Sequence, residues 1–275
     1  MKLYAWIGII CFFSTTVLAA NEPLTVGGRV KGMSNISVSV VDFWSIANNP
    51  AVMPFYGKLS VGIAYENRFL LKETSNAVFG MSIPAGKAGA FGFCMNHFGG
   101  NNYGQFNAGL SYSLSFAKVF SFGLKFNYLM EHFGSSEYPA RHGFTFDVGM
   151  YGQVTPQFSL GFFVSNPARL RMQTYNDIKE YLPTVFRLGA GYKFGQKFLL
   201  AAELEKNLEA RMQGNLGAEY VFADYLSIKA GLRVPDFQFT VGIGTKFKGL
   251  SIDFASTYQL QLGYCPQISL HYDIK

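Results

Sequence analysis

The strongest constraint on this chain is a two-residue period in hydropathy that continues from Leu59 almost to the C-terminus. Residues 106–116 place apolar side chains at even positions and asparagine, glycine or serine at most odd positions, and 186–194 and 237–247 repeat the alternation. An amphipathic helix needs a period near 3.6 residues, whereas a half-buried strand needs a period of two. These segments are therefore predicted strands, and the chain is predicted to be all-β.

Glycine, proline, lysine and polar clusters divide the alternating region into separate strands. The pattern predicts fourteen of them, over residues 59–69, 76–83, 88–97, 105–116, 119–133, 141–154, 158–164, 184–194, 198–206, 213–222, 225–233, 237–247, 250–262 and 267–274. Short links follow the even-numbered strands, and mostly longer links follow the odd-numbered ones. An even count with short turns on one side is typical of a bacterial outer-membrane β-barrel, in which the short turns are periplasmic. Both chain ends are then expected on the periplasmic side.

Charge placement favours a barrel over a secreted β-sandwich, which would also alternate. Only 15% of residues are charged, against about 25% in an average soluble domain. The charges within the strands share the glycine- and serine-rich parity, and none falls among the phenylalanines, leucines and valines. A barrel interior explains this parity, because charge facing lipid at mid-bilayer costs about 2–4 kcal/mol. The predicted lumen charges are Lys125, Asp147, Arg187, Lys193, Glu203, Glu219, Lys229, Lys246 and Asp253, with Arg187 or Lys193 expected to pair with Glu203 across neighbouring strands.

The first residues have the form of a cleaved secretory signal. Met1 and Lys2 precede an apolar stretch and then the small residues Ala19 and Ala20. The apolar stretch is too short for the alternative, a membrane anchor. We therefore expect a signal peptide over 1–20, an N-terminal segment over 21–58 and the barrel over 59–275.

The sequence contains no signature of metal, nucleotide or nucleic-acid binding. Cys94 is expected in a strand and Cys265 in a distant loop, so a disulfide between them is not expected. The four histidines are scattered singly, so no metal site and no cofactor are predicted. His132, Ser135 and His142 are the only grouping that an outer-membrane hydrolase could use, and we predict no catalytic residue. The net charge of +6 is not accompanied by a basic-aromatic module, which excludes nucleic-acid binding. We assign this charge to a basic rim facing lipopolysaccharide or to the lumen.

Residues 21–58 do not share the alternation. They contain Gly28-Arg29, Gly32-Met33, a β-prone run over 36–41, Asp42 and then Asn49-Pro50-Ala51. In this order the motif resembles the N-terminal hatch of FadL-type transporters of hydrophobic compounds and of the related PorV/PorQ-type barrels of Bacteroidetes. The resemblance implies a fourteen-stranded barrel with a hatch inside or below the lumen, whose motif residues here are Arg29, Asp42, Asn49, Pro50 and Ala51.

Two functions follow from this resemblance. The first is passive uptake of a small hydrophobic compound past the hatch with exit sideways through the wall. Its expected capture surface is the loop 165–183, through Leu170, Met172, Tyr175, Ile178 and Tyr181. The second is a non-transporting accessory barrel of a type IX secretion system. The expected partners are outer-membrane lipid and lipopolysaccharide, together with a small hydrophobic ligand or a secretion-system component.

Overall fold

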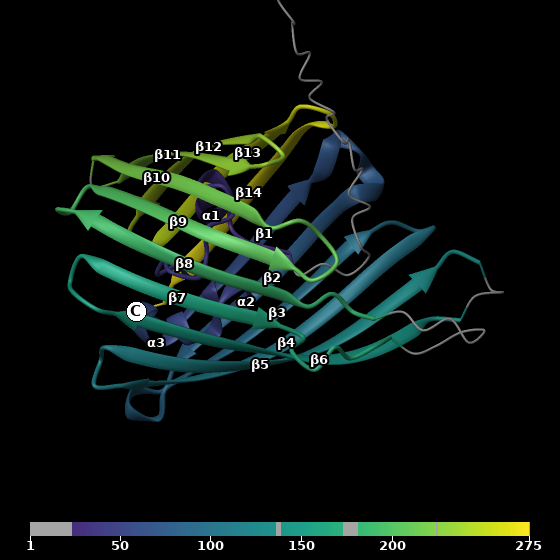
Figure 1. The fold of residues 1–275 in the computed structure, drawn as a ribbon, viewed down its shortest axis with the longest axis horizontal. Coiled ribbons are helices and arrows are strands. Elements are labelled where there is room, and N and C mark those ends of the chain that lie inside the picture. The colour runs from purple at the N-terminus through teal and green to yellow at the C-terminus, as the bar shows by residue number, and fades with distance from the viewer. Residues whose placement is uncertain (1–23, 136–138, 173–180, 224, 275) are drawn as a thin grey trace, which may run out of the picture.

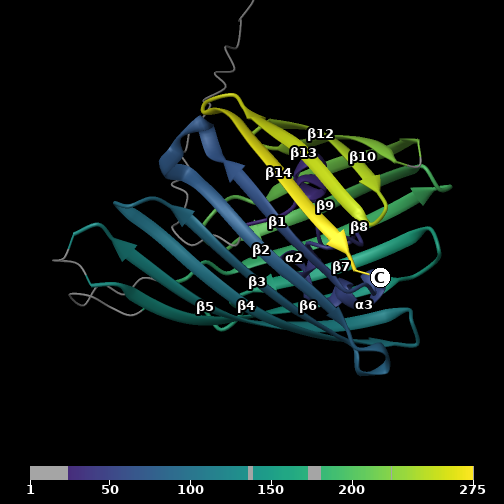
Figure 2. The same ribbon diagram turned by 180° about the vertical axis from the view of Figure 1, so that it is seen from behind.

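A computed structural model describes residues 24–135, 139–172, 181–223 and 225–274 of the chain. Fourteen antiparallel strands close into a single barrel in which each strand pairs with its neighbours in sequence and β1 pairs with β14 (Figures 1 and 2). The strands are β1 (Ser60–Asn67), β2 (Ser75–Pro84), β3 (Ala90–Gly99), β4 (Tyr103–Phe116), β5 (Phe120–Phe133), β6 (Arg141–Gln153), β7 (Phe158–Ser165), β8 (Val185–Phe194), β9 (Phe198–Asn207), β10 (Gln213–Ala223), β11 (Leu226–Val234), β12 (Gln238–Phe247), β13 (Leu250–Gln259) and β14 (Gly263–Asp273). The predicted count and the all-β barrel class are confirmed.

The helical pieces are short and are not part of the barrel wall. Before β1 come α1 (Gly28–Gly32), α2 (Ser45–Asn48), the 3-10 turn η1 (Pro50–Val52) and α3 (Met53–Tyr56). Three further 3-10 turns lie in links, η2 (Arg68–Leu70), η3 (Lys72–Thr74) and η4 (Gly86–Ala88). No helix among the described residues is both long and apolar enough to cross a bilayer.

The apolar side chains point outward, as the alternation predicts. Phe126 and Phe144 are 64% and 68% exposed, whereas their sequence neighbours on the other face, Asn127 and Thr145, are buried. In a sandwich the aromatic face would be the buried one, so the closed ring with exposed aromatics excludes that alternative. The wall is thus a cylinder whose outer surface suits hydrocarbon.

The two rims of the barrel differ. We call the rim where β1 begins and β14 ends the turn end; it carries the links 85–89, 117–119, 154–157, 195–197, 224–225 and 248–249. The opposite rim, the loop end, carries the longer links 68–74, 134–140, 166–184 and 208–212. Its links 100–102, 235–237 and 260–262 are short. The first and the last are shorter than the sequence pattern indicated, because β3, β4 and β14 extend further toward this rim.

The wall also varies in height around the ring. β4 and β5 have 14 residues each, whereas β1 and β7 have 8. Figure 1 shows β5 and β6 reaching well beyond β7 at the loop end. The loop-end rim is therefore sloped rather than level.

Cys265 lies within β14, opposite Thr257 of β13, and not in a loop as expected. The expectation was wrong because the residues around Pro266 interrupt the hydropathy pattern although the ladder continues through them. Cys94 and Cys265 are both free and buried.

Candidate functional site: the plugged lumen

The N-terminal segment fills the lumen. Residues 24–58, which we call the hatch, run inside the barrel and carry α1, α2 and α3 (Figure 1). Most of their apolar side chains are buried. The run 36–41 forms bends rather than the β-structure that its composition suggested. Strand pairing is not possible there, because the surrounding wall strands already satisfy one another around the closed ring.

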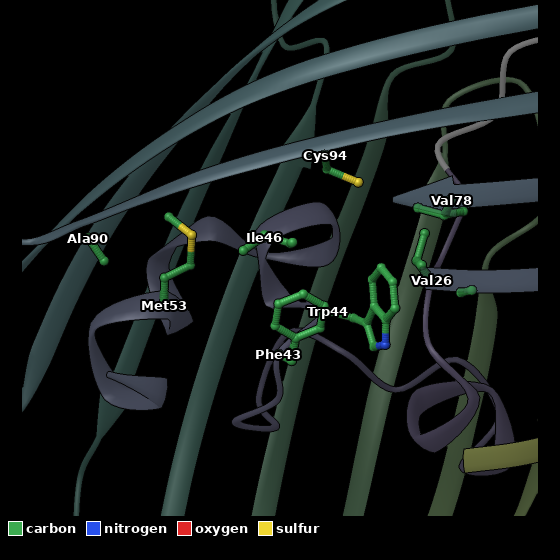
Figure 3. Packing of buried hydrophobic residues seen from close by; sticks show 9 residues of the cluster. Val26, Phe43, Trp44, Ile46, Met53, Val78, Ala90 and Cys94 are labelled. Carbon is green, nitrogen blue, oxygen red and sulfur yellow. The ribbon is translucent and has the colours of Figure 1, made fainter. Parts of the chain in front are cut away.

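An apolar cluster attaches the hatch to one side of the wall. Phe43, Trp44 and Ile46 pack with Met53 and with small side chains of β1 to β3, including Ala64 and Cys94 (Figure 3). Phe43 and Trp44 meet edge to face, with ring centroids 4.8 Å apart. Full burial of these rings makes the cluster the largest apolar contribution to hatch docking.

Ion pairs attach the hatch to the opposite side of the wall. Arg29 of α1 donates to both carboxylate oxygens of Glu219 on β10, with a shortest distance of 2.6 Å, and to the carbonyl oxygen of Val41. Glu219 also lies 3.7 Å from Lys229 on β11, which donates to Asp253 on β13 at 2.6 Å. Burial lowers the pKa of the Arg29 guanidinium, but the Glu219 carboxylate outweighs it and the pKa is raised. Arg29 is therefore charged at any physiological pH.

A second ion pair, made with β1 on the side of the apolar cluster, and a carboxylate on β9 attach the hatch at two further places. Lys31 donates to Glu66 near the loop end of β1 at 2.9 Å. Burial lowers the pKa of Lys31, with the Glu66 carboxylate opposing the shift. Glu203 on β9 accepts the backbone N–H groups of Ser37 and Val38 at 2.7 and 3.0 Å. Each carboxylate thus satisfies donors of the hatch that water cannot reach.

Asn49 organises the middle of the hatch. Its side-chain oxygen accepts the N–H of Ala51 at 3.2 Å, and its amide donates to Val38 at 2.9 Å and, more weakly, to the carbonyl oxygens of Met150 and Phe162 in the wall. Pro50 begins the 3-10 turn, and the Ala51 carbonyl accepts the Ser121 hydroxyl. Asp42, the remaining motif residue, is buried and its carbonyl accepts the N–H of Ser45.

The inward-facing glycines make room for the hatch backbone. A Cβ at Gly161 would lie 1.9 Å from the carbonyl oxygen of Val38, one at Gly149 would lie 2.1 Å from Oδ1 of Asn49, and one at Gly123 would lie 2.4 Å from the nitrogen of Ala51. Side chains cannot approach so closely, so glycine is required where the hatch touches the wall. This contact is the physical reason for the glycine-rich parity.

Seven of the nine charges assigned to the lumen are buried there, and these are Lys125, Asp147, Arg187, Glu203, Glu219, Lys229 and Asp253. Lys193 and Lys246 continue the inward-facing rows but are exposed at the turn end. Arg187 lies 4.0 Å from Glu203 and makes its shorter contact, 2.7 Å, with its register partner Glu205. The alternative pair was wrong, because the register partner of Glu203 is Gly189 and not Lys193.

A chamber with a mixed polar and apolar lining lies beside the hatch in the loop half of β3 to β8. Its cavity volume is about 70 Å³. Its polar lining includes Asn96, Gln105, Asn107, Lys125, Asn127, Thr145, Asp147, Ser165, Asn166 and Arg187. The apolar part of the lining is about as large as the polar part and includes Val26, Phe106, Leu129, Phe163 and Leu182.

Leu24, the first described residue, also lines this chamber. Ile274, the last described residue, donates its backbone N–H to the Leu59 carbonyl at the turn end. The expectation that both chain ends lie on the turn side therefore fits the C-terminus, whereas the described chain begins inside the barrel on the loop side of the hatch. The difference arises because the hatch crosses the lumen before it reaches β1.

The expected capture loop folds partly into the mouth. Met172 is buried with Leu129 and Leu182 against the inner wall. Leu170 and Tyr181 are exposed, and the guanidinium groups of Arg169 and Arg171 lie 5.4 and 4.7 Å from the ring centre of Tyr181. The other two predicted residues, Tyr175 and Ile178, lie outside the described residues. The described part of this loop is thus a cationic and aromatic surface.

The remaining chemical candidates are dispersed. His132 stacks with His97 and His142 bonds to the Tyr128 hydroxyl at 2.8 Å, all four on outward-facing positions. Within the described ranges no three histidine, cysteine or acidic side chains are placed to hold a metal ion. The contacts that sequence reasoning missed are Glu66 with Lys31, Glu205 with Arg187, and the wall serines that bond hatch carbonyls. The sequence feature that pointed to these contacts was the row of small polar residues at inward-facing positions.

The closed fourteen-stranded wall with a lipid-facing apolar surface and a filled interior defines an outer-membrane β-barrel. Residues 43–265 match the family described as type IX secretion system membrane protein PorP/SprF, and the chain belongs to that family. The resemblance to type IX barrels is thereby confirmed, with PorP/SprF in place of PorV/PorQ. No individually curated protein matches the sequence.

Solved structures share the fold at low identity. A FadL homologue of Pseudomonas aeruginosa is 14% identical with a TM-score of 0.66, and the match covers 92% of this chain and 99% of that chain. The monoaromatic hydrocarbon channel CymD is 12% identical with a TM-score of 0.68, covering 93% and 99%. The toluene transporter TbuX of Ralstonia pickettii is 11% identical with a TM-score of 0.66, covering 91% and 98%. These likenesses establish a FadL-like fold.

Proposed function

We propose that this protein is a non-transporting component of a type IX secretion system, a barrel that is permanently closed by its hatch and serves as a membrane-embedded scaffold. The observation that carries the proposal is the attachment of the hatch on both sides of the lumen. The cluster around Phe43 and Trp44 holds it to β1 to β3, and the Arg29–Glu219 pair holds it to β10. A gated hatch would need one attachment that a ligand can release. A ligand shifts the equilibrium between closed and open hatch only by the difference between its affinities for the two states.

The continuity of the wall supports the same proposal. β3 and β4 pair without interruption from Ala90 opposite Ser113 to Gly99 opposite Gly104. Among the described strand pairs, the single register shift lies between Val221 and Ala223 of β10, close to the turn end. Sideways exit of a ligand would require a break in such a ladder at membrane depth, where unpaired backbone groups are costly.

Uptake of a small hydrophobic compound is the second candidate, favoured by the fold shared with proteins titled as toluene and monoaromatic hydrocarbon transporters. The unbroken ladder argues against it. We also place the turn end in the periplasm and the loop end outside the cell, following the general arrangement of such barrels.

A deletion strain complemented with the full chain tests the proposal. We expect deletion to abolish secretion of type IX cargo and complementation to restore it, while uptake of a hydrophobic fluorescent dye is the same in all strains. Normal secretion in the deletion strain would overturn the scaffold role. Loss of dye uptake with normal secretion would support the uptake role instead.

A further inference from the structure

Among the described residues, the exposed charges at the turn end have one sign; Asp224, in the link 224–225, lies outside the described residues. In the part of the chain that the structure describes, every exposed charged side chain at this rim is a lysine. The one acidic residue there, Asp273, is buried and bonded to Tyr56, Lys58 and Ser60. The rim lysines are Lys58, Lys87, Lys118, Lys193, Lys197, Lys246 and Lys248. The loop end differs, since exposed Glu73, Glu209 and Asp236 are interspersed there with arginines and lysines.

Two of the tight turns hold lysine where the backbone disfavours it. Lys118 has a φ of 55° and Lys248 a φ of 46°, both in the left-handed region. Asparagine or glycine is the preferred residue at such hairpin positions, and other side chains cost about 1 kcal/mol there. Both turns present the lysine side chain at a fixed place on the rim.

The lysines form two tiers that together surround the mouth. Lys193 and Lys246 continue the inward-facing rows of β8 and β12, and Lys58 leaves the hatch beside them. Lys87, Lys118, Lys197 and Lys248 lie at the turn tips outside this inner tier. Phosphates of the surrounding bilayer can reach the tips but not the inner tier, which faces the barrel axis. A binding partner that uses both tiers must therefore cover the mouth from the water side.

We propose that the turn end is a docking surface for the acidic face of a soluble periplasmic protein, which caps the barrel. The proposal rests on the orientation and the secretion role given under the proposed function. Lipopolysaccharide lies in the opposite leaflet in that orientation, so it is not the partner of this basic rim. Charge complementarity of this kind steers association and weakens as salt screens it, with a Debye length of about 8 Å at physiological ionic strength.

Zero-length coupling of carboxylates to amines by a carbodiimide in intact cells tests this surface, because it joins a lysine only to an acid in direct contact. The variant Lys87→Gln/Lys118→Gln/Lys197→Gln/Lys248→Gln should lose the cross-linked protein–protein species and reduce cargo secretion at least tenfold, with unchanged barrel in the outer membrane. The loop-end variant Lys72→Gln/Arg169→Gln/Arg171→Gln/Arg211→Gln is the matched control and should retain both.

Arginine at the same four turn positions keeps the positive charge but removes the primary amine that the carbodiimide couples. It should restore secretion and leave only the cross-links that the inner-tier lysines Lys58, Lys193 and Lys246 make, because the reagent does not couple guanidinium groups. Unchanged secretion in the glutamine variant would overturn the docking surface. The scaffold role would still be tested separately by the deletion strain. A cross-linked species consisting of two copies of this chain, or retention on purified peptidoglycan sacculi that depends on the four lysines, would overturn the soluble-protein partner.

Discussion

Arg29 and Glu219 lie on opposite sides of the boundary between hatch and wall and are joined by a forked ion pair with a shortest distance of 2.6 Å. The residues are 190 positions apart in sequence, so the contact exists only when the barrel is closed around the hatch. Lys229 and Asp253 extend it into an alternating row of charges along the inner wall. The row ties the position of α1 to three wall strands.

Replacing Arg29 with methionine should loosen the hatch. Glu219 would lose its forked donor, and breaking a buried pair by removing one partner costs about 3 kcal/mol, which corresponds to about 100-fold more frequent local opening. Cys94, buried under Ile46 and its neighbours, reports this opening through its rate of alkylation in a Cys265→Ser background. Arg29→Lys should give an intermediate rate. An unchanged rate in Arg29→Met would mean that the pair does not hold the hatch.

Adding one methyl group at Gly161 should destabilise the folded barrel. The new Cβ would lie 1.9 Å from the Val38 carbonyl oxygen, a backbone atom that can move only with the hatch. Overpacking of this kind costs about 1–3 kcal/mol and should lower the urea midpoint of the protein in lipid vesicles. Gly152→Ala is the control, since its nearest atom is 3.9 Å away. Equal midpoints for the two variants would contradict close contact between hatch and wall.

Changing Asn49 to aspartate should be more damaging than changing it to alanine. The Asn49 amide donates to carbonyl oxygens, and a carboxylate at that place would face them without a donor. Alanine should cost about 1–3 kcal/mol for the hydrogen bonds that are lost, and aspartate more. Protease resistance of the hatch and the urea midpoint measure the difference. Equal loss for both would show that the amide donor is unimportant.

A disulfide across β3 and β4 should leave secretion intact. Asn96 and Asn107 are register partners, so Asn96→Cys/Asn107→Cys in a Cys94→Ser/Cys265→Ser background would fasten the two strands together. If the wall never opens, secretion should be equal before and after reduction. An oxidised variant that is inactive and recovers on reduction would indicate that these strands separate during function.

Much of the fold could be predicted because alternation reports directly on the two environments of a barrel wall. Phe126 faces outward and Asn127 faces inward for the reason that the sequence indicated. Strand ends were less predictable at the loop end, where Pro266 and Cys265 break the hydropathy pattern within a continuous ladder.

The contacts between hatch and wall could be predicted from the sequence less well than the fold. The buried charges could be located by parity, but their partners depend on register and on the path of the hatch. Glu203 was expected to pair with arginine or lysine, and its shortest contacts are the backbone N–H groups of Ser37 and Val38. No local pattern carries that information, because the two segments are joined only through the closed ring.

The hatch touches strands from all parts of the ring, and its last residues lead directly into β1, which pairs with the final strand β14. Docking of the hatch and sealing of the β1–β14 seam must therefore be completed together during biogenesis. An altered hatch should be visible first as a delay in maturation of newly made protein, before any defect in the finished molecule is measured.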